Sequence, residues 1–442
     1  MINKIKRIAK TDLIQTSFLN GIANIVRIFT GLISNKIVAV YLGPAGVALL
    51  GQFNNLTSMA MSFSTLGINS GITKYTAEYY DNNTERQNIL STGFMLTLIG
   101  SIVTSFVVFF MRGYLSRSLL HTDEYSAAFG LLAFTLILFA INAYLVSALN
   151  GYKEFKKVIS VNVATSIIGL IISIALVITY GVYGAFIGVI LSQTLVCFIT
   201  IFFVIKCSWF HPKNFLSGIN KESLKKLGKF SLMALTSVFA ITFIQLQIRN
   251  YIMNSISIQD AGYWQGVTKI SDLYLTFITT TLAIYYLPRL SEIKKSEELR
   301  REIKKGYIFL LPLTIISTVL IYVFRSFIVK TLFSESFAPM VYLFPMQLLG
   351  NIFKISSWLL GYVIVAKAMT RVFITTEIIF GISFYLLTRL FVARYGVVGA
   401  TYSYAVNYFI YMVVLLVVFN SMRSKKIICD QTSSEPENIT EV

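Results

Sequence analysis

Charged residues are scarce in this sequence. Only 13% of its 442 residues are Asp, Glu, Lys or Arg, whereas soluble domains carry about a quarter. Hydrophobic residues account for 55%, and the mean hydropathy is +0.70. Apolar runs of about twenty residues, the length that crosses a hydrocarbon layer, recur from end to end. The composition therefore excludes a soluble protein and predicts an all-α integral membrane protein.

Residues that carry enzyme chemistry are also few. The three cysteines show no CxxC spacing, and the two histidines, His121 and His211, fall in predicted loops far apart in the sequence. The sequence has no Walker A loop and no paired acidic motif at an outer helix end, and the outer loop at 112–125 is too short for a polymerase-like domain. We therefore expect no enzyme, no metal site and no cofactor, and if the protein moves a solute, we expect the movement to be passive or coupled to H⁺ or Na⁺.

The apolar runs predict twelve transmembrane helices. The basic segment 1–10 precedes the first run without a small-residue cleavage site, so the first helix is expected to be retained. The predicted helices lie near 13–42, 45–70, 88–111, 126–149, 158–180, 185–205, 230–254, 263–287, 307–328, 339–365, 372–393 and 400–422.

Lysine and arginine are distributed unevenly between the loops. If the N-terminus is cytoplasmic, the inside segments carry 27 of the 38 Lys and Arg residues and the outside segments carry five. Cytoplasmic loops of membrane proteins have this excess. The net charge of +18 is thus explained by orientation rather than by binding of nucleic acid, and both termini are predicted to be cytoplasmic.

Two sequence echoes indicate an internal duplication. The segment Tyr180–Gly184 reads YGVYG and Tyr395–Gly399 reads YGVVG, at an offset of 215 residues. The pair Ala45-Gly46 recurs as Ala261-Gly262 at an offset of 216. Glycine by itself marks many tight loops, but two matching offsets favour a parallel repeat of six helices, a type known among transporters.

The longest interior polar stretch divides the chain between these two repeats. We predict an N-lobe of helices 1–6 over residues 1–205, a cytoplasmic inter-lobe linker over 206–229 and a C-lobe of helices 7–12 over 230–422. The last residues, 423–442, are predicted to be a disordered cytoplasmic tail because they are polar and end acidic.

The predicted helices contain more cations than carboxylates. Ionisable groups inside a bilayer cost several kcal/mol unless they are paired or hydrated, so each one suggests a functional site. Several of them continue polar stripes at helical spacing, as Arg27 does with Asn24 and Arg249 with Gln245, which a water-filled cavity between two lobes would require. The six cations are Arg27, Lys36, Arg249, Lys269, Lys354 and Arg389, against Asp272 and Glu377.

A surplus of fixed positive charge favours an anionic ligand. Arginine offers a bidentate contact to phosphate and lysine offers a point charge, so a pyrophosphate headgroup fits such a cavity. Trp264, Gln265 and Trp358 could contact attached sugars, and Asp272 and Glu377 are the candidates for ion coupling. The predicted substrate-binding residues of this cationic cavity are Arg27, Lys36, Arg249, Lys354, Asn24 and Gln245.

Structural roles stay open for several of these residues. Lys36 and Arg389 lie near helix ends and could reach the membrane interface, and Arg249 could serve in packing. Asp272 could pair with Lys269, three residues away on the same helix, while Glu377 could pair with a basic residue of the preceding loop. Tryptophans also belong to ordinary interfacial belts.

The sequence resembles the Wzx-type O-antigen and enterobacterial common antigen flippases of the MOP exporter superfamily, over its whole length except the tail. The stretches that carry the resemblance are Gly43–Gly46, Gly71–Tyr75, Trp264–Gly266 with Ile270–Asp272, and Gly361–Lys367. The resemblance implies two six-helix lobes in a V shape around a cationic cavity in a bacterial inner membrane. It also implies an undecaprenyl-pyrophosphate oligosaccharide as cargo, with Arg27, Lys36, Arg249, Lys354 and Asp272 matching the family pattern.

Other functions remain as alternatives. The resemblance leaves open whether the cargo is the O-antigen unit or the common antigen lipid, and it implies a polymerase and a chain-length regulator as pathway partners. A multidrug or cation antiporter of the same superfamily should have an acidic or apolar cavity instead. A membrane glycosyltransferase or polymerase would need the acidic motif and outer domain that the sequence lacks.

Overall fold

The computed structural model describes residues 2–424, except residues 216, 283–285, 294 and 368. Every regular element in this part of the chain is helical, which confirms the predicted all-α class. The chain divides into two compact units. Unit 1 is Met1–Leu246 with Leu332–Ser334, and unit 2 is Gln247–Thr331 with Glu335–Val442. The predicted tail lies outside the described residues from 425 onward.

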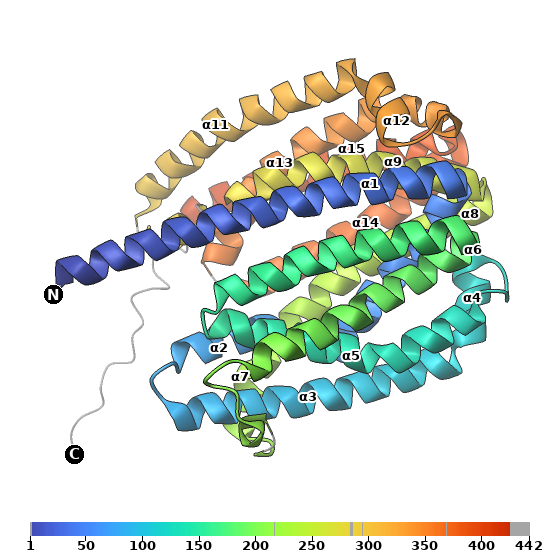
Figure 1. The fold of residues 1–442 in the computed structure, drawn as a ribbon. Helices are drawn as coiled ribbons and strands as arrows, with labels where there is room; N and C mark the ends of the chain where they lie inside the picture. The colour runs from blue at the N-terminus through green and yellow to red at the C-terminus, as the bar shows by residue number, and fades with distance from the viewer. Residues whose placement is uncertain (1, 216, 283–285, 294, 368, 425–442) are drawn as a thin grey trace. The chain divides into compact units, whose positions relative to one another are not determined.

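Unit 1 is a bundle of long helices. Helix α1 packs along α6, and α5 packs against both α3 and α6, as Figure 1 shows for the blue to green part of the chain. Its elements are α1 (Ile2–Ser64), α2 (Asn69–Glu78), α3 (Asn83–Phe110), α4 (Arg112–Leu120), α5 (Ser126–Gly151), α6 (Phe155–Ile205), the 3₁₀ turn η1 (Pro212–Phe215), α7 (Lys221–Val238) and the π-helical η2 (Phe239–Phe243).

Unit 2 is built around one central helix, α13, which contacts α9, α11, α14 and α15. Helix α8 starts at the end of unit 1 and continues into unit 2. The elements are α8 (Ile244–Ser255), α9 (Ile258–Thr281), α10 (Leu287–Glu292), α11 (Ser296–Val323), α12 (Arg325–Leu332), the 3₁₀ segment η4 (Glu335–Leu343), α13 (Phe344–Ala366), α14 (Thr370–Tyr395) and α15 (Val398–Ser424).

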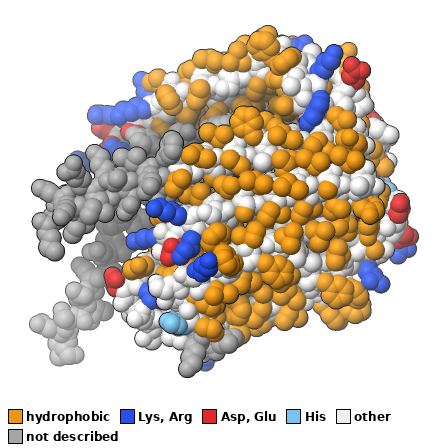
Figure 2. Space-filling model, in the orientation of Figure 1, with side chains coloured by type: hydrophobic (Ala, Val, Ile, Leu, Met, Phe, Trp, Pro, Cys, Tyr) orange, Lys and Arg blue, Asp and Glu red, His pale blue; other side chains and the backbone are white. Residues whose placement is uncertain are grey.

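Nine helices of the described residues are long and apolar enough to cross a membrane. Hydrophobic side chains cover the middle of the face shown in Figure 2, while many of the charged side chains lie near its margins. Two candidate spans, 21–64 and 155–205, have 44 and 51 residues, about twice the length that a bilayer needs. The predicted number of twelve helices is not confirmed by this count.

Glycines interrupt both of these long helices. Gly43 has φ +63° and ψ −171°, and Gly181 has φ +59° and ψ −134°, both far from helical values. Gly396, between α14 and α15, has nearly the same conformation, with φ +59° and ψ −150°. Positive φ is easily reached only by glycine. The first glycines of the two YGV echoes therefore adopt one backbone conformation.

The second glycines of these echoes also match. A Cβ on Gly184 would lie 1.9 Å from the carbonyl oxygen of Leu176, and a Cβ on Gly399 would lie 2.2 Å from that of Phe391. Both carbonyls belong to the residue eight positions earlier. Each turn thus brings two helices so close that no side chain fits between them. The common geometry supports the predicted duplication, which stays a prediction.

The helix predicted from residue 230 begins earlier, at Lys221. The Asn220 side chain accepts hydrogen bonds from the backbone N–H groups of Glu222 and Ser223, each at 3.0 Å. This N-cap and the acidic Glu222 in the first turn stabilise the start of the helix. The prediction missed this start because the residues around it are polar. The predicted inter-lobe linker therefore contains the first turns of α7, and the lobe boundaries themselves stay a prediction.

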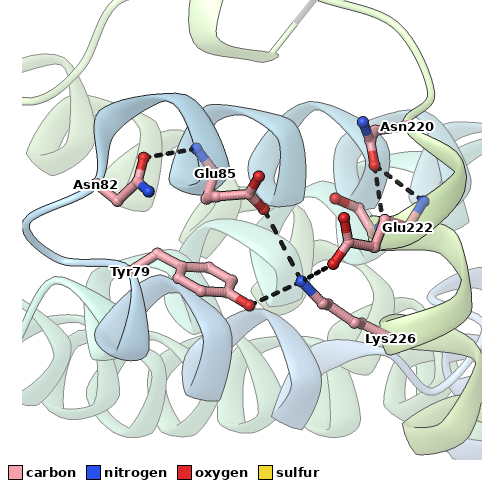
Figure 3. A network of polar contacts seen from close by, with 7 residues as sticks. Tyr79, Asn82, Glu85, Asn220, Glu222 and Lys226 are labelled. Atoms are coloured by element: carbon pink, nitrogen blue, oxygen red, sulfur yellow. Dashed lines mark hydrogen bonds and ion pairs between the residues drawn. The ribbon is translucent and has the colours of Figure 1, made fainter. Parts of the chain in front are cut away.

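A polar network joins the start of α7 to α2 and α3 (Figure 3). The Lys226 ammonium lies 2.6 Å from a Glu222 oxygen, 3.9 Å from a Glu85 oxygen and 2.8 Å from the Tyr79 hydroxyl. Glu85 lies in the first turn of α3, and Tyr79 directly follows α2. The network therefore fixes three helix ends of unit 1 together.

Candidate anion-binding site

Aromatic rings surround the ammonium group of Lys354 in the middle of α13. Its Nζ lies 5.0 Å from the ring centroid of Trp358, 5.5 Å from Tyr408 and 5.8 Å from Tyr404. The two tyrosine rings come from α15 and contact each other with centroids 4.8 Å apart. Ring faces attract a cation by about 0.5–2 kcal/mol each, most when water is excluded. The cluster therefore holds a positive charge at a defined place inside unit 2.

Hydrogen bonds fix the helices that carry this cluster. The Asn351 amide nitrogen, one turn before Lys354, donates to the Ser271 hydroxyl of α9 at 2.9 Å, and its oxygen accepts from the Tyr404 hydroxyl at 2.8 Å. Asn351 is fully buried. Buried polar groups are costly to leave unpaired. These two hydrogen bonds therefore fix the positions of α9, α13 and α15 relative to one another around the lysine.

Both carboxylates predicted for ion coupling act on the Lys354 charge. Asp272 comes from α9 and Glu377 from α14, and each interacts electrostatically with the ammonium. Within the described residues no carboxylate oxygen lies within 4.0 Å of Lys354, and none lies that close to Lys269. The lysine is thus balanced by two nearby charges without a direct ion pair, which leaves its hydrogen-bond donors available for an anion.

A second buried cation lies in the same unit. Arg249 of α8 is only 2% exposed, its guanidinium donates to the side-chain oxygen of Gln265 in α9, and its Cζ lies 5.7 Å from the ring centroid of Trp264. The structure therefore brings three predicted site residues together. Trp264 is also 2% exposed, so its contact here is with the arginine.

The remaining predicted residues lie in unit 1. Arg27 and Asn24 are exposed on α1, and Gln245 is half-buried. The Lys36 ammonium donates to the backbone oxygen of Phe333, so its charge contacts a carbonyl. The roles assigned to these residues from sequence stay predictions.

The sequence indicated Trp358 but not the two tyrosines of the Lys354 cluster. One face of α15 carries tyrosines at the three/four spacing of a helix, Tyr404, Tyr408 and Tyr411. This spacing was the sequence feature that could have indicated the tyrosines of the cluster. It could not be used because tyrosine is frequent in membrane helices for other reasons.

Comparison with known proteins identifies the family. Residues 22–342, more than half of the chain, match the model of a family described as polysaccharide biosynthesis protein. The chain belongs to this family. The predicted resemblance is confirmed, and the chain is a multi-pass membrane protein whose relatives are transporters, not enzymes.

Two relatives align with most of this chain. The chain is 28% identical over 419 residues to the lipid III flippase of Escherichia coli (strain K12), and the alignment covers 92% of this chain and 98% of that protein. It is 22% identical over 378 residues to a putative O-antigen transporter of Shigella flexneri, covering 83% and 88% of the two chains.

The fold is similar to that of solved transporters of the MOP superfamily. An inward-facing structure of a multidrug resistance MATE family transporter aligns over 92% of this chain and 96% of its own, with a TM-score of 0.80 at 12% identity. At this identity the likeness concerns the fold and not the transported substrate.

Proposed function

We propose that this protein is a flippase that moves an undecaprenyl-pyrophosphate-linked oligosaccharide from the cytoplasmic to the periplasmic leaflet of a bacterial inner membrane. The single observation that carries the proposal is the pair of cations inside unit 2, Lys354 and Arg249. The family and its relatives, a lipid III flippase and a putative O-antigen transporter, support a lipid-linked sugar as cargo.

The chemistry of the Lys354 cluster fits a pyrophosphate. Two carboxylates hold the lysine charge at a distance while no cargo is present. A pyrophosphate carries at least two negative charges and several acceptor oxygens, so it can form the direct, charge-assisted hydrogen bonds that the carboxylates do not form. Arg249 adds bidentate geometry, and the exposed part of Trp358 offers an apolar ring to a sugar.

We further propose that twelve helices form two six-helix lobes, with both termini in the cytoplasm, and that the lobes alternate access to the two leaflets. The glycine interruptions in α1 and α6 support a count above nine, because each divides one overlong helix into two segments of spanning length and the nine candidate spans become eleven. The matching turns at Gly181 and Gly396 support a duplicated origin of the lobes.

The cation site distinguishes this proposal from a multidrug or cation exporter. A cationic drug would be repelled by Lys354 and Arg249, since like charges in a medium of low dielectric constant repel strongly. Asp272 and Glu377 are proposed to couple transport to H⁺ or Na⁺. Each carboxylate could lose its hold on the lysine when an ion binds, and this would free the ammonium for the cargo.

The higher identity to the lipid III flippase favours the enterobacterial common antigen lipid as a second candidate cargo beside the O-antigen unit. Purified protein in liposomes with either lipid would separate the two. The faster leaflet exchange identifies the cargo.

The same liposomes test the main proposal. We expect exchange of the lipid-pyrophosphate sugar by the wild type, and none of a neutral glycolipid with the same sugar. Lys354→Gln and Arg249→Gln should reduce exchange, whereas Arg389→Gln, on an exposed side chain of α14, should not. Unchanged exchange in both site variants would exclude the anion site in unit 2.

A further inference from the structure

A polar cavity lies in unit 1, away from the cation cluster of unit 2. It has a volume of about 380 Å³ and is formed by the first turns of α3, the residue after α5 and the loop after α6. The residues that matter for its chemistry are Arg86, Tyr152, Ser208, Trp209 and His211. The Lys and Arg distribution assigns this end of the helices to the cytoplasmic side.

Arg86, which lines this cavity, and Lys153, which follows the lining residue Tyr152 in the chain, contact neutral groups. The Arg86 guanidinium donates to the backbone oxygen of Tyr80 and to the side-chain oxygen of Asn83, and its Cζ lies 5.2 Å from the Tyr152 ring. The Lys153 ammonium lies 5.5 Å from the Tyr80 ring. In the described part of the chain neither cation has a carboxylate oxygen within 4.0 Å. Their charge is therefore available to an anion.

A stacked aromatic pair gives the cavity a rigid wall. The rings of Tyr152 and Trp209 are 4.0 Å apart and inclined by only 8°. Burial raises the pKa of the Tyr152 hydroxyl, and the nearby Arg86 guanidinium opposes this increase. The Arg86 guanidinium thus lies against the Tyr152 ring of this stacked pair, which helps to hold it in place without neutralising it.

An apolar cavity of about 280 Å³ adjoins the polar one. The loop after α6 separates them, because Trp209 and His211 line the polar cavity whereas Phe210 and Pro212 line the apolar one. On α3, Leu90 lines the polar cavity and Phe94 the apolar one. One helical turn separates these two residues, about 6 Å along the axis. A single molecule with a charged head and an apolar chain can therefore reach both cavities.

We propose that the two cavities together bind an anionic phospholipid of the cytoplasmic leaflet, with its phosphate at Arg86 and an acyl chain beside Phe94 and Phe210. Basic residues at the inner surface of membrane proteins attract anionic lipid headgroups, and an arginine fork matches phosphate oxygens. A soluble phosphate would use the polar cavity alone and would leave the apolar cavity without a role. The site is independent of the cargo site, and its test uses lipid binding rather than transport.

Photo-crosslinking measures this binding directly. The full-length protein is placed in nanodiscs that contain a trace of phosphatidylglycerol or phosphatidylcholine with a diazirine on one acyl chain. After irradiation, adducts are mapped by mass spectrometry. We expect phosphatidylglycerol adducts in the peptides around Phe94 and residues 201–212, and roughly tenfold fewer from phosphatidylcholine.

Two kinds of variant test the headgroup contact. Arg86→Gln removes the charge and should reduce the phosphatidylglycerol adducts about tenfold. Ser208→Glu adds a carboxylate at the exposed rim of the cavity and should reduce them similarly, while its neutral match Ser208→Gln should not. This second pair keeps the test valid if Arg86→Gln disturbs the Tyr80 loop. Lys206→Gln, an equal loss of charge outside the cavity lining, should leave the yield within about twofold.

Several results would overturn the assignment. One is equal labelling of these peptides by the two lipids, and another is equal labelling of the Ser208→Glu and Ser208→Gln proteins. A third is loss of the phosphatidylglycerol adducts on addition of millimolar glycerol phosphate, because a soluble phosphate would then suffice to fill the site.

Discussion

The cations predicted for the site have different surroundings in the two units. In unit 2, Lys354 lies among three aromatic rings with two carboxylates nearby, and Arg249 is buried against a tryptophan and a glutamine. In unit 1, Lys36 donates to a backbone carbonyl and Arg27 is exposed. Neutral rings and distant carboxylates hold the Lys354 charge without using its donors, whereas Arg249 and Lys36 each donate to a carbonyl oxygen, of the Gln265 side chain and of the Phe333 backbone respectively.

This contrast gives a criterion for reading charges in a membrane helix. The cost of burying a cation is the same whether the residue binds a ligand or stabilises a helix end. The nature of its partners separates the two cases. By this criterion we expect Lys354 to act on the cargo and Lys36 to have a mainly structural role.

The largest expected effect comes from Lys354→Ala. We expect transport to fall by more than about a hundredfold, because a direct charge-assisted contact contributes roughly 1.5–3 kcal/mol and the alanine also leaves Asp272 and Glu377 without their cation. Leaflet exchange in liposomes measures the rate, and detergent extraction of the membranes checks insertion. Lys354→Arg, which keeps the charge, should recover part of the rate. Full activity of the Lys354→Ala protein would show that Lys354 is not needed for transport and that the proposed difference between the units is wrong.

The next effect concerns the carboxylates. Asp272→Asn or Glu377→Gln should leave the lysine with one counter-charge and reduce the stimulation of transport by an imposed ion gradient, by roughly tenfold if that carboxylate carries the coupling ion. Exchange is measured with and without a pH or Na⁺ gradient. Glu335→Gln, at an exposed position of η4, serves as the control. Gradient stimulation that is the same in all three variants would exclude both carboxylates as coupling groups.

A smaller effect is expected on stability. It tests a feature that the two units share, the close helix contact at Gly184 and Gly399. Gly184→Ala and Gly399→Ala each place a methyl group against a backbone carbonyl, and we expect each to destabilise the protein by about 1–3 kcal/mol. Thermal unfolding in detergent measures both. Gly169→Ala, where a Cβ would meet nothing within 4 Å, should be neutral. A large loss at one turn and none at the other would argue against a common geometry.

The smallest effect is expected for Lys36→Met. Loss of one hydrogen bond to the Phe333 carbonyl should cost about 1 kcal/mol of stability, and transport should change by less than about threefold. The same thermal and exchange assays apply. Should transport fall as far as in Lys354→Ala, Lys36 would belong with the cargo-binding cations and the criterion of partner type would be wrong.

The sequence correctly predicted the all-helical class, but it misplaced some helix ends and its number of twelve helices is not confirmed. The start of α7 at Lys221 depends on the Asn220 cap, a local signal hidden within a polar, basic stretch that resembles a loop. The turns at Gly181 and Gly396 were correctly marked by their glycines, because positive φ and close helix approach both demand that residue.

The candidate site was only partly predictable. The ionisable residues were visible because charge inside an apolar helix is rare and costly. Their partners were not, since Lys354, Asp272, Glu377 and Tyr404 come from four helices that are far apart in the sequence. The cavity at Arg86 was hidden for a similar reason: its arginine and its aromatic wall lie in separate loops and helix ends.

The sequence alone determined that this protein is an all-helical membrane protein, because the apolar surface of its long runs can only be buried in lipid or against other helices. It also determined which side chains carry charge into the membrane. Only the tertiary structure decided which of these charges face aromatic rings, carboxylates or a carbonyl, since those neighbours meet through helix packing, and the partner of a buried cation decides what the cation can bind.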